Sequence, residues 1–235
     1  MISDFKHYSQ LAKIFKYPSG PEYTEGVNEC YAMIRKNYPE LAPSFLPFVE
    51  YINSHEAYQI EETFNLTFHI QAICFLDLGY VLFGEDYKRG EFLVHMKKEH
   101  EKINHDCGCE LADNLPNVLE LMTLSSDIKF LNELGVRILI PALEKMTKEF
   151  DMARIALRQK MYKKKERVVL DKDDHIGNIY GAPMEVLLKI LQKDFDGISF
   201  VNNDFVPEYG RNLLTNCGTC SVSHTPQTTN STISQ

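Results

Sequence analysis

The stretch AICFLDLGYVLF, residues 72–83, is the most apolar part of the chain and the part that decides the predicted fold. Its interruptions are Asp77 and Gly79, and Gly84 follows it directly. A helix that is apolar nearly all round has to be buried, and glycine is a natural helix end. The stretch is shorter than the roughly 20 residues that cross a bilayer. We therefore predict that residues 72–83 form the central buried helix of a globular protein.

Apolar side chains recur at helical spacing on both sides of this stretch. The segments with such a face are residues 5–15, 23–34, 45–52, 60–68, 92–103, 118–122, 130–134 and 183–194. Ser19 and Glu22 have the spacing of a capping box, and Asp127 is expected to begin a later helix. Pro141 is expected to kink or restart that element, which then continues as a long helix to about Lys164.

No segment shows the period-two alternation of a strand, and residues 168–170 are the only short β-like run. Residues 104–114 have no periodicity and are expected to form a loop that ends with Asn114 as a helix cap. The sequence thus predicts an all-α fold, a single bundle of about eight to ten helices. The bundle is expected to span residues 1–206, followed by a flexible tail, 207–235, rich in Ser and Thr.

The formal net charge is −8, which disfavours a duplex nucleic acid as partner, because such binding needs clustered cations. An acidic surface does suit a basic partner, such as a peptide that carries arginines. The N-terminus lacks the features of a signal peptide, so we expect a cytoplasmic protein that does not insert into a membrane. Whether it is a monomer or a dimer stays open.

Two motifs in the middle of the chain are the most informative. The first includes Tyr80, Leu82, Phe83, Gly84, Arg89 and Gly90, and the second includes Leu111, Asp113, Asn114, Leu115, Pro116, Leu119 and Glu120. In the first motif, a predicted helix ends at aromatic residues and the next helix begins with acidic residues. In the second motif, the residues Asp-Asn-Leu-Pro cap the start of a helix. Helix ends of this kind could form a cleft for a peptide with apolar and basic side chains, or could serve packing and capping alone.

These motifs resemble those of the nitrate reductase delta-subunit (NarJ-like) chaperones, within the TorD and DmsD group of redox-enzyme maturation proteins. The upstream run Glu61-Glu62-Thr63-Phe64-Asn65 is similar to the acidic-aromatic segment of that family. The resemblance covers about residues 58–122. Where many relatives have histidine after the aspartate, this chain has Asn114, which removes a titratable group.

The resemblance implies an all-helical chaperone with no catalytic activity and no cofactor of its own. Its partner would be the catalytic subunit of a molybdopterin oxidoreductase, nitrate reductase or a related enzyme. It would bind the N-terminal segment, often a twin-arginine leader, until the molybdenum cofactor has been inserted. The residues expected to bind the client are Glu61, Phe64, Tyr80, Leu82, Phe83, Asp86, Arg89, Asp113, Asn114, Leu115 and Pro116. The acids expected at the rim of the groove are Glu61, Glu62, Asp77, Glu85 and Asp86.

Six cysteines support an alternative of a different class, a metal- or redox-sensing helical regulator. Cys107 with Cys109 and Cys217 with Cys220 could together supply four thiolates to zinc or to a cluster, with His105 or His224 nearby in sequence. Free thiols in a reducing compartment are the simpler interpretation. A third alternative is a helical adaptor that shares the fold but serves another partner.

A basic run covers residues 154–167. Such a run suits the C-terminal end of a helix, or could bind a phosphate-bearing ligand.

The chain has no P-loop, no Gly-x-Gly-x-x-Gly, no paired zinc-protease histidines and no serine in a nucleophile elbow. The absence of these motifs disfavours the common enzyme classes.

Overall fold

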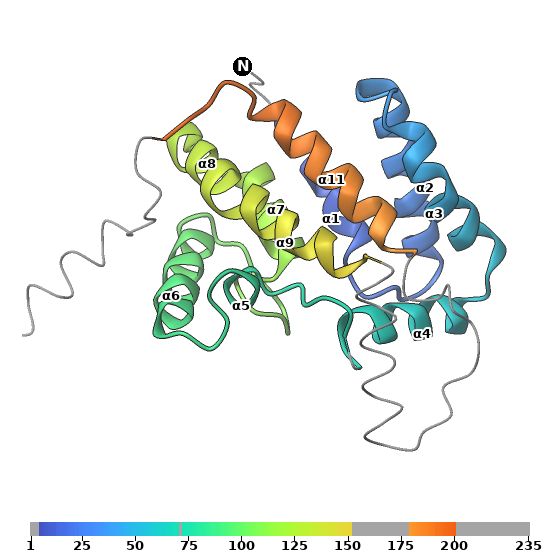
Figure 1. The fold of residues 1–235 in the computed structure, drawn as a ribbon, viewed down its shortest axis with the longest axis horizontal. Helices are drawn as coiled ribbons and strands as arrows, with labels where there is room; N and C mark the ends of the chain where they lie inside the picture. Colours follow the sequence, from blue (N-terminus) through green and yellow to red (C-terminus); the bar gives the residue numbers. More distant parts are fainter. Residues whose placement is uncertain (1–4, 71, 152–178, 201–235) are drawn as a thin grey trace, which may run out of the picture. The chain divides into compact units, whose positions relative to one another are not determined.

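The computed structural model describes residues 5–70, 72–151 and 179–200 of the chain (Figure 1). These residues form a helical bundle with no strand, so the predicted all-α class is confirmed, and the number of helices agrees with the predicted range. The helices are α1 (Tyr8–Ile14), α2 (Pro21–Asn37), α3 (Ala42–Ser54), α4 (Ala57–Phe68), α5 (Leu78–Phe83), α6 (Tyr87–Lys102), α7 (Leu115–Leu124), α8 (Ile128–Leu134), α9 (Ile140–Glu149) and α11 (Gly181–Asp194).

Helices from both ends of the described chain share one core. Helix α1 packs against α2 and α7, and α11 packs against α3 and α9, as Figure 1 shows for the orange α11 beside the yellow α9. The short helix α5 packs against α6 and α9. The apolar faces predicted from helical spacing meet at these contacts, because each amphipathic helix must bury its apolar stripe against another element.

An aromatic cluster fills the core between α3, α4 and α11. Tyr180 at the start of α11 is fully buried, and its ring lies 5.1 Å from Phe48, 5.8 Å from Phe64 and 5.0 Å from Phe68. Its hydroxyl is 2.9 Å from that of Tyr23, which in turn donates to a main-chain carbonyl of α1 at 2.9 Å. Since the polar tip of each ring has a partner, the cluster can bury aromatic surface without an unpaired hydroxyl.

A buried carboxylate joins the first and last helices. Asp194, at the end of α11, accepts hydrogen bonds from the hydroxyls of Tyr8 at 2.9 Å and Tyr38 at 2.7 Å. The Nε2 of His7 lies 2.8 Å from the same carboxylate. The side chain of Asp194 is 0% exposed, so these donors replace the water that the charge loses on burial.

The prediction of one central helix over residues 72–83 is wrong. Helix α5 covers only Leu78–Phe83, and residues 72–77 are not helical. The main-chain N–H groups of Ile73 and Cys74 instead donate to the carbonyl of Thr67, and the carbonyl of Leu76 accepts from the N–H of Leu115. Hydrogen bonds to other segments therefore replace those of a helix, and the apolar composition of the segment reflects burial in a non-helical conformation.

The helix boundaries confirm some of the predicted signals and correct others. Asp127 caps α8, since its carboxylate accepts from the N–H of Phe130 at 3.0 Å. The predicted capping box at Ser19 is wrong, because Gly20 occupies the N-cap position of α2 and makes no side-chain hydrogen bond. The helix predicted to continue to about Lys164 is not continuous, since α9 stops at Glu149, and the predicted end lies outside the described residues. A π-helical turn, Gly135–Leu139, joins α8 to α9 just before Pro141.

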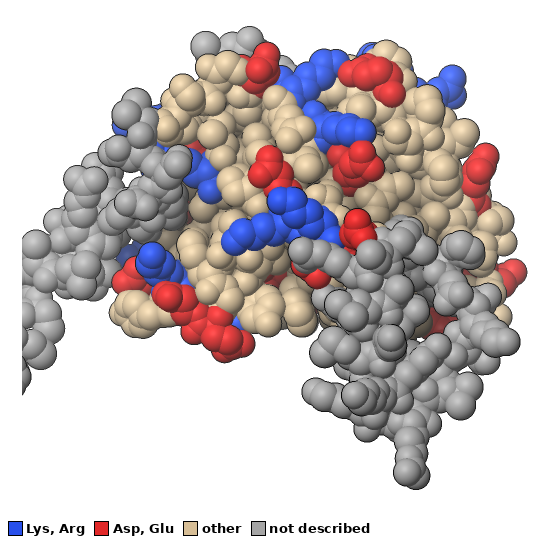
Figure 2. Space-filling model, in the orientation of Figure 1, with Lys and Arg blue, Asp and Glu red and all other residues tan. Residues whose placement is uncertain are grey.

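Acidic and basic side chains are interspersed on the face shown in Figure 2, rather than gathered into one basic patch. Among the described helices, none is both long enough and apolar enough to cross a membrane. The basic run at residues 154–167, the β-like residues 168–170, the tail 207–235, and Cys217, Cys220 and His224 lie outside the described residues.

Candidate functional site

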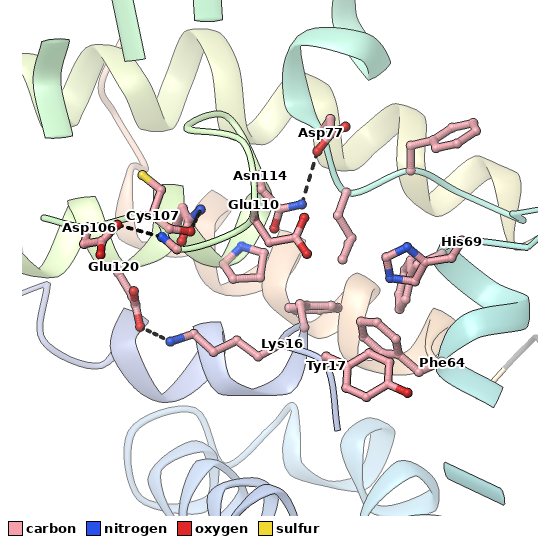
Figure 3. Close-up of a pocket in the computed structure, with 17 residues that line it drawn as sticks. Lys16, Tyr17, Phe64, His69, Asp77, Asp106, Cys107, Glu110, Asn114 and Glu120 are labelled. Atoms are coloured by element: carbon pink, nitrogen blue, oxygen red, sulfur yellow. Dashed lines mark hydrogen bonds and ion pairs between the residues drawn. The ribbon is translucent and has the colours of Figure 1, made fainter. Parts of the chain in front are cut away.

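A cleft of about 450 Å³ opens where five segments meet (Figure 3). We call it the junction cleft, and its walls come from the end of α1, the end of α4, the residues before α5, the loop before α7, and α7 itself. The residues that line it are Phe15, Lys16, Tyr17, Phe64, Phe68, His69, Phe75, Leu76, Asp77, Asp106, Cys107, Gly108, Glu110, Asn114, Pro116, Asn117 and Glu120. Pockets of this size accommodate a few side chains of a ligand.

One side of the junction cleft is aromatic. Phe64 is almost fully buried, and the ring of Tyr17 packs edge-on against it with 5.6 Å between centroids. Tyr17 is 47% exposed and Phe75 is 44% exposed, so both rings offer apolar surface to a ligand. Figure 3 shows Tyr17 and Phe64 side by side, with His69 above them. Exposed aromatic side chains beside a pocket are typical of a surface that binds apolar groups.

The other side of the junction cleft is acidic. Four carboxylates line it: Asp77, Asp106, Glu110 and Glu120. Lys16 is the one lysine or arginine among the described residues that line it, and it is paired with Glu120 (Figure 3). Asp106 and Glu110 are exposed. The excess of negative charge favours a ligand with positive groups.

The second motif singled out in the sequence reaches this cleft through Asn114, Pro116 and Glu120, whereas no residue of the first motif lines it. Asp77 and Asn114 form an isolated antiparallel bridge, and the amide of Asn114 donates to the carboxylate of Asp77 at 3.1 Å, as drawn in Figure 3. Two main-chain hydrogen bonds flank the pair, from Leu78 N–H to the carbonyl of Asp113 at 3.0 Å and from Leu115 N–H to the carbonyl of Leu76 at 2.9 Å. The bridge fixes the entrance of α5 against the entrance of α7. Asn114 is the N-cap residue of α7, as predicted, but its side chain binds Asp77 instead of the helix end.

Asp113 is a buried positioning residue of this junction. It is 0% exposed, and its Oδ2 accepts from the N–H of Gly79 at 2.9 Å. A Cβ on Gly79 would lie 2.6 Å from that oxygen, so the close approach requires glycine. Burial raises the pKa of Asp113, and the neighbouring Asp77 raises it further, against the opposing effects of the Gly79 N–H and of Arg89. Asp113 therefore holds the start of α5 and cannot touch a ligand in this conformation.

The raised pKa of Asp113 predicts a pH dependence of stability. The Asp113 carboxyl binds its proton more tightly in the folded state than in the unfolded state. Its protonated form therefore contributes to the free energy of unfolding fully at low pH, and this contribution is lost as pH rises through the pKa of the folded state. We expect the free energy of unfolding of Asp113→Asn to increase relative to that of the wild type as pH rises above about 4, the usual carboxyl pKa.

Urea denaturation over a pH series measures this difference, and equal pH profiles for the two proteins would contradict it. Asp113→Ala is the control that also removes the acceptor for Gly79. Its pH profile should run parallel to that of Asp113→Asn, at a free energy of unfolding about 1–3 kcal/mol lower.

The remaining predicted client-binding residues divide between the junction cleft and its surroundings. Phe64, Asn114 and Pro116 line the cleft, and Glu61 adjoins it through a 3.1 Å hydrogen bond from the hydroxyl of Tyr17. Leu115 is fully buried and, like Asp113, does not reach the surface.

The part of the predicted set that lies on α5 and α6 is placed elsewhere. Tyr80 lines a neighbouring hollow of about 380 Å³ with Phe75 and Lys145. Leu82 accepts a hydrogen bond at its carbonyl from Lys145 at 3.0 Å, and Phe83 packs on Phe92.

Polar members of the set have local roles. Arg89 lies over the ring of Tyr80 and 3.9 Å from Asp77. Asp86 is exposed and caps α6 by accepting from the N–H of Lys88 at 2.9 Å. Of the predicted rim acids, Asp77 lines the junction cleft, whereas Glu62, Glu85 and Asp86 do not.

Several residues of the cleft were missed in the sequence. They are Phe15, Lys16, Tyr17, His69, Phe75, Asp106, Glu110 and Glu120. Pro18 predicts that the first helix ends near Tyr17. No local pattern indicates that the ring of Tyr17 lies beside that of Phe64, because this contact joins residues far apart in the chain.

No protein-family model matches the chain, and no curated protein matches it. The described residues define the protein by structure, as an all-helical bundle with an aromatic and acidic cleft at the junction of α4, α5 and α7.

Proposed function

We propose that this protein is a non-catalytic assembly chaperone of the NarJ-like kind. It binds the N-terminal segment of the catalytic subunit of a molybdopterin oxidoreductase in the cytoplasm while the molybdenum cofactor is inserted. The observation that supports this most directly is the junction cleft, which combines exposed aromatic rings with an excess of carboxylates. Its lining includes Asn114 and Pro116 of the second motif that resembles the chaperone family, and Phe64 of the upstream acidic-aromatic run.

The aromatic side of the cleft fits the apolar part of such a segment. Tyr17 and Phe75 are each nearly half exposed, and burying their rings against aliphatic side chains of a peptide removes apolar surface from water. The buried residues beneath them, such as Phe64, keep the rings in place. A preformed surface lowers the ordering cost on the side of the protein, though not that of the disordered peptide.

The acidic side fits the arginines of a leader segment. Asp106 and Glu110 are exposed carboxylates on the loop before α7, and Asp77 lines the cleft with them. Charge complementarity of this kind raises the association rate and selects basic segments, and it weakens with salt. A modest affinity suits the proposed role, because the client has to be released once it has folded.

The test is a titration with a synthetic peptide that has an arginine pair followed by an apolar stretch. We expect wild-type protein to bind it at micromolar concentration and Phe75→Ala to bind about ten-fold more weakly, which corresponds to about 1.4 kcal/mol. Tyr87→Ala is the matched control, since Tyr87 is 80% exposed on α6 and does not line the cleft.

The double variant Asp106→Asn and Glu110→Gln tests the acidic side. It should weaken binding at low salt and approach the wild type at high salt. The control Glu22→Gln with Glu25→Gln removes the same charge from the exposed surface of α2 and should have little effect. A wild type that does not bind the peptide, or a Phe75→Ala variant that binds it as the wild type does, would overturn the proposal.

A further inference from the structure

Three metal-ligating side chains converge where α6 ends and the loop before α7 begins. One ligand atom each from His100, His105 and Cys107 lies within 4.8 Å of the others. The Nδ1 atoms of the two histidines are 2.8 Å apart. His100 is buried, whereas His105 and Cys107 are partly exposed, so a solvent ion can reach the cluster.

The Nε2 atom of each histidine faces a group that accepts a hydrogen bond. The Nε2 of His100 is 2.9 Å from the carbonyl oxygen of Ala112, which can only accept. The Nε2 of His105 is 2.8 Å from Glu120. Glu120 is also paired with Lys16, so it is a carboxylate that accepts the hydrogen bond from His105. Both histidines therefore carry their proton on Nε2.

This arrangement leaves two lone pairs pointing at each other. In the neutral imidazoles, each Nδ1 is an acceptor, and two acceptors at 2.8 Å repel unless a cation lies between them. A proton on one Nδ1 relieves this repulsion in the metal-free protein, and a divalent ion that takes its place, releasing it to solvent, gains Sγ of Cys107 as a third ligand. Metal-binding histidines typically donate the other ring N–H to a carboxylate or a main-chain carbonyl, which are the two partners found for these rings.

We propose that His100 and His105, through Nδ1, and Cys107, through Sγ, bind one divalent transition-metal ion with the preference of a zinc site. Two imidazoles and a thiolate are a ligand set that suits zinc, with a fourth position left for water or for a ligand. Around a tetrahedral ion with bonds of about 2.0–2.1 Å, two nitrogens lie about 3.3 Å apart. The two Nδ1 atoms would thus separate by about half an ångström.

The ion replaces the proton of the thiol. Burial raises the pKa of Cys107, and Asp106 and Glu120 raise it further, so the thiol is protonated in the metal-free protein. Binding forms the metal–sulfur bond and releases that proton to solvent. These ligands differ from the predicted set of four cysteines, since Cys109 is exposed and is not part of the cluster.

Metal binding at this site would also restrain one wall of the junction cleft. Cys107 and Glu120 line the same wall of the cleft, as Figure 3 shows, and His105 is bound to Glu120. An ion at this position ties the end of α6 to the loop and to α7. The loop residues Asp106 and Glu110, which form part of the acidic side, would then be held more firmly.

The experiment uses the full chain, purified without an affinity tag and stripped with a chelator, and titrates it with Co²⁺ and then Zn²⁺. We expect one equivalent of Co²⁺ to bind, with a near-ultraviolet thiolate-to-cobalt absorption band that Zn²⁺ abolishes. Cys107→Ser should lose the band and bind Co²⁺ at least about ten-fold more weakly. The matched control Cys109→Ser should keep both.

A second measurement needs no variant. Zn²⁺ should slow the alkylation of Cys107 in the wild type and leave that of Cys109 unchanged, as followed by mass spectrometry of the digested protein. Absence of a cobalt band in the wild type, a band that persists in Cys107→Ser, a band lost in Cys109→Ser, or alkylation of Cys107 that Zn²⁺ does not slow would overturn the proposal.

Discussion

Asp194→Ala is expected to lower the free energy of unfolding by about 3 kcal/mol. The substitution removes the acceptor of Tyr8, Tyr38 and His7, and the hydroxyls of Tyr8 and Tyr38 are buried. Burying a polar group without a partner costs about 1–3 kcal/mol, and these donors cannot all turn to water. The same contacts join α1 and the end of α2 to α11, so their loss also weakens the packing between these helices.

Two variants separate the parts of this effect. Asp194→Asn keeps one carbonyl oxygen and should cost about 1 kcal/mol, because one tyrosine retains its acceptor. Tyr38→Phe removes one donor and leaves the carboxylate bound to Tyr8, so it should also cost about 1 kcal/mol. Urea denaturation followed by circular dichroism measures all three. A loss below about 1 kcal/mol for Asp194→Ala would contradict the prediction, because it would mean that water satisfies the donors of Tyr8, Tyr38 and His7 nearly as well as the carboxylate does.

Phe64→Ala is expected to cost about 3–5 kcal/mol, the largest effect of any substitution proposed for this protein. The ring is 2% exposed and lies 5.0 Å from Phe68, 5.6 Å from Tyr17 and 5.8 Å from Tyr180. Removing it takes away the transfer free energy of the ring and leaves a cavity among aromatic neighbours that cannot collapse freely. Differential scanning calorimetry or chemical denaturation measures the loss.

Matched controls exist on the same helix. Tyr58→Ala also removes an aromatic ring from α4, but Tyr58 is 68% exposed, so the change should stay within about 0.5 kcal/mol. Phe64→Leu fills much of the space and should cost about 1–2 kcal/mol. If Phe64→Ala were as stable as Tyr58→Ala, the aromatic cluster would not support the cleft. This large effect on folding makes Phe75→Ala, at an exposed ring, the sharper test of peptide binding.

The chaperone proposal and the metal proposal can fail separately. Peptide binding depends on Phe75 and on the exposed acids, whereas cobalt binding depends on Cys107 and the two histidines. Both share Glu120, which pairs with Lys16 and with His105. A change of peptide affinity when Zn²⁺ is added to the wild type, absent in Cys107→Ser, would link the two sites.

The sequence by itself determined the class of fold. Apolar positions at helical spacing predicted α1 to α4, α6 to α8 and α11, and Asp127 was recognised as a helix cap, because these signals depend on neighbours within one or two turns. The same local signals misjudged residues 72–77, where main-chain hydrogen bonds to Thr67 and Leu115 replace those of a helix.

Only the tertiary structure decided which of the singled-out residues are exposed and which are buried. Asp113 and Leu115, which were expected to bind the client, are in the core, whereas Tyr17 and Phe75, which the sequence did not single out, reach the cleft. The meeting of His100 with Cys107 likewise depends on how the loop turns after α6. Periodicity records which side of a helix is apolar, but contacts between distant segments are set by packing and by buried hydrogen bonds, which leave no local pattern.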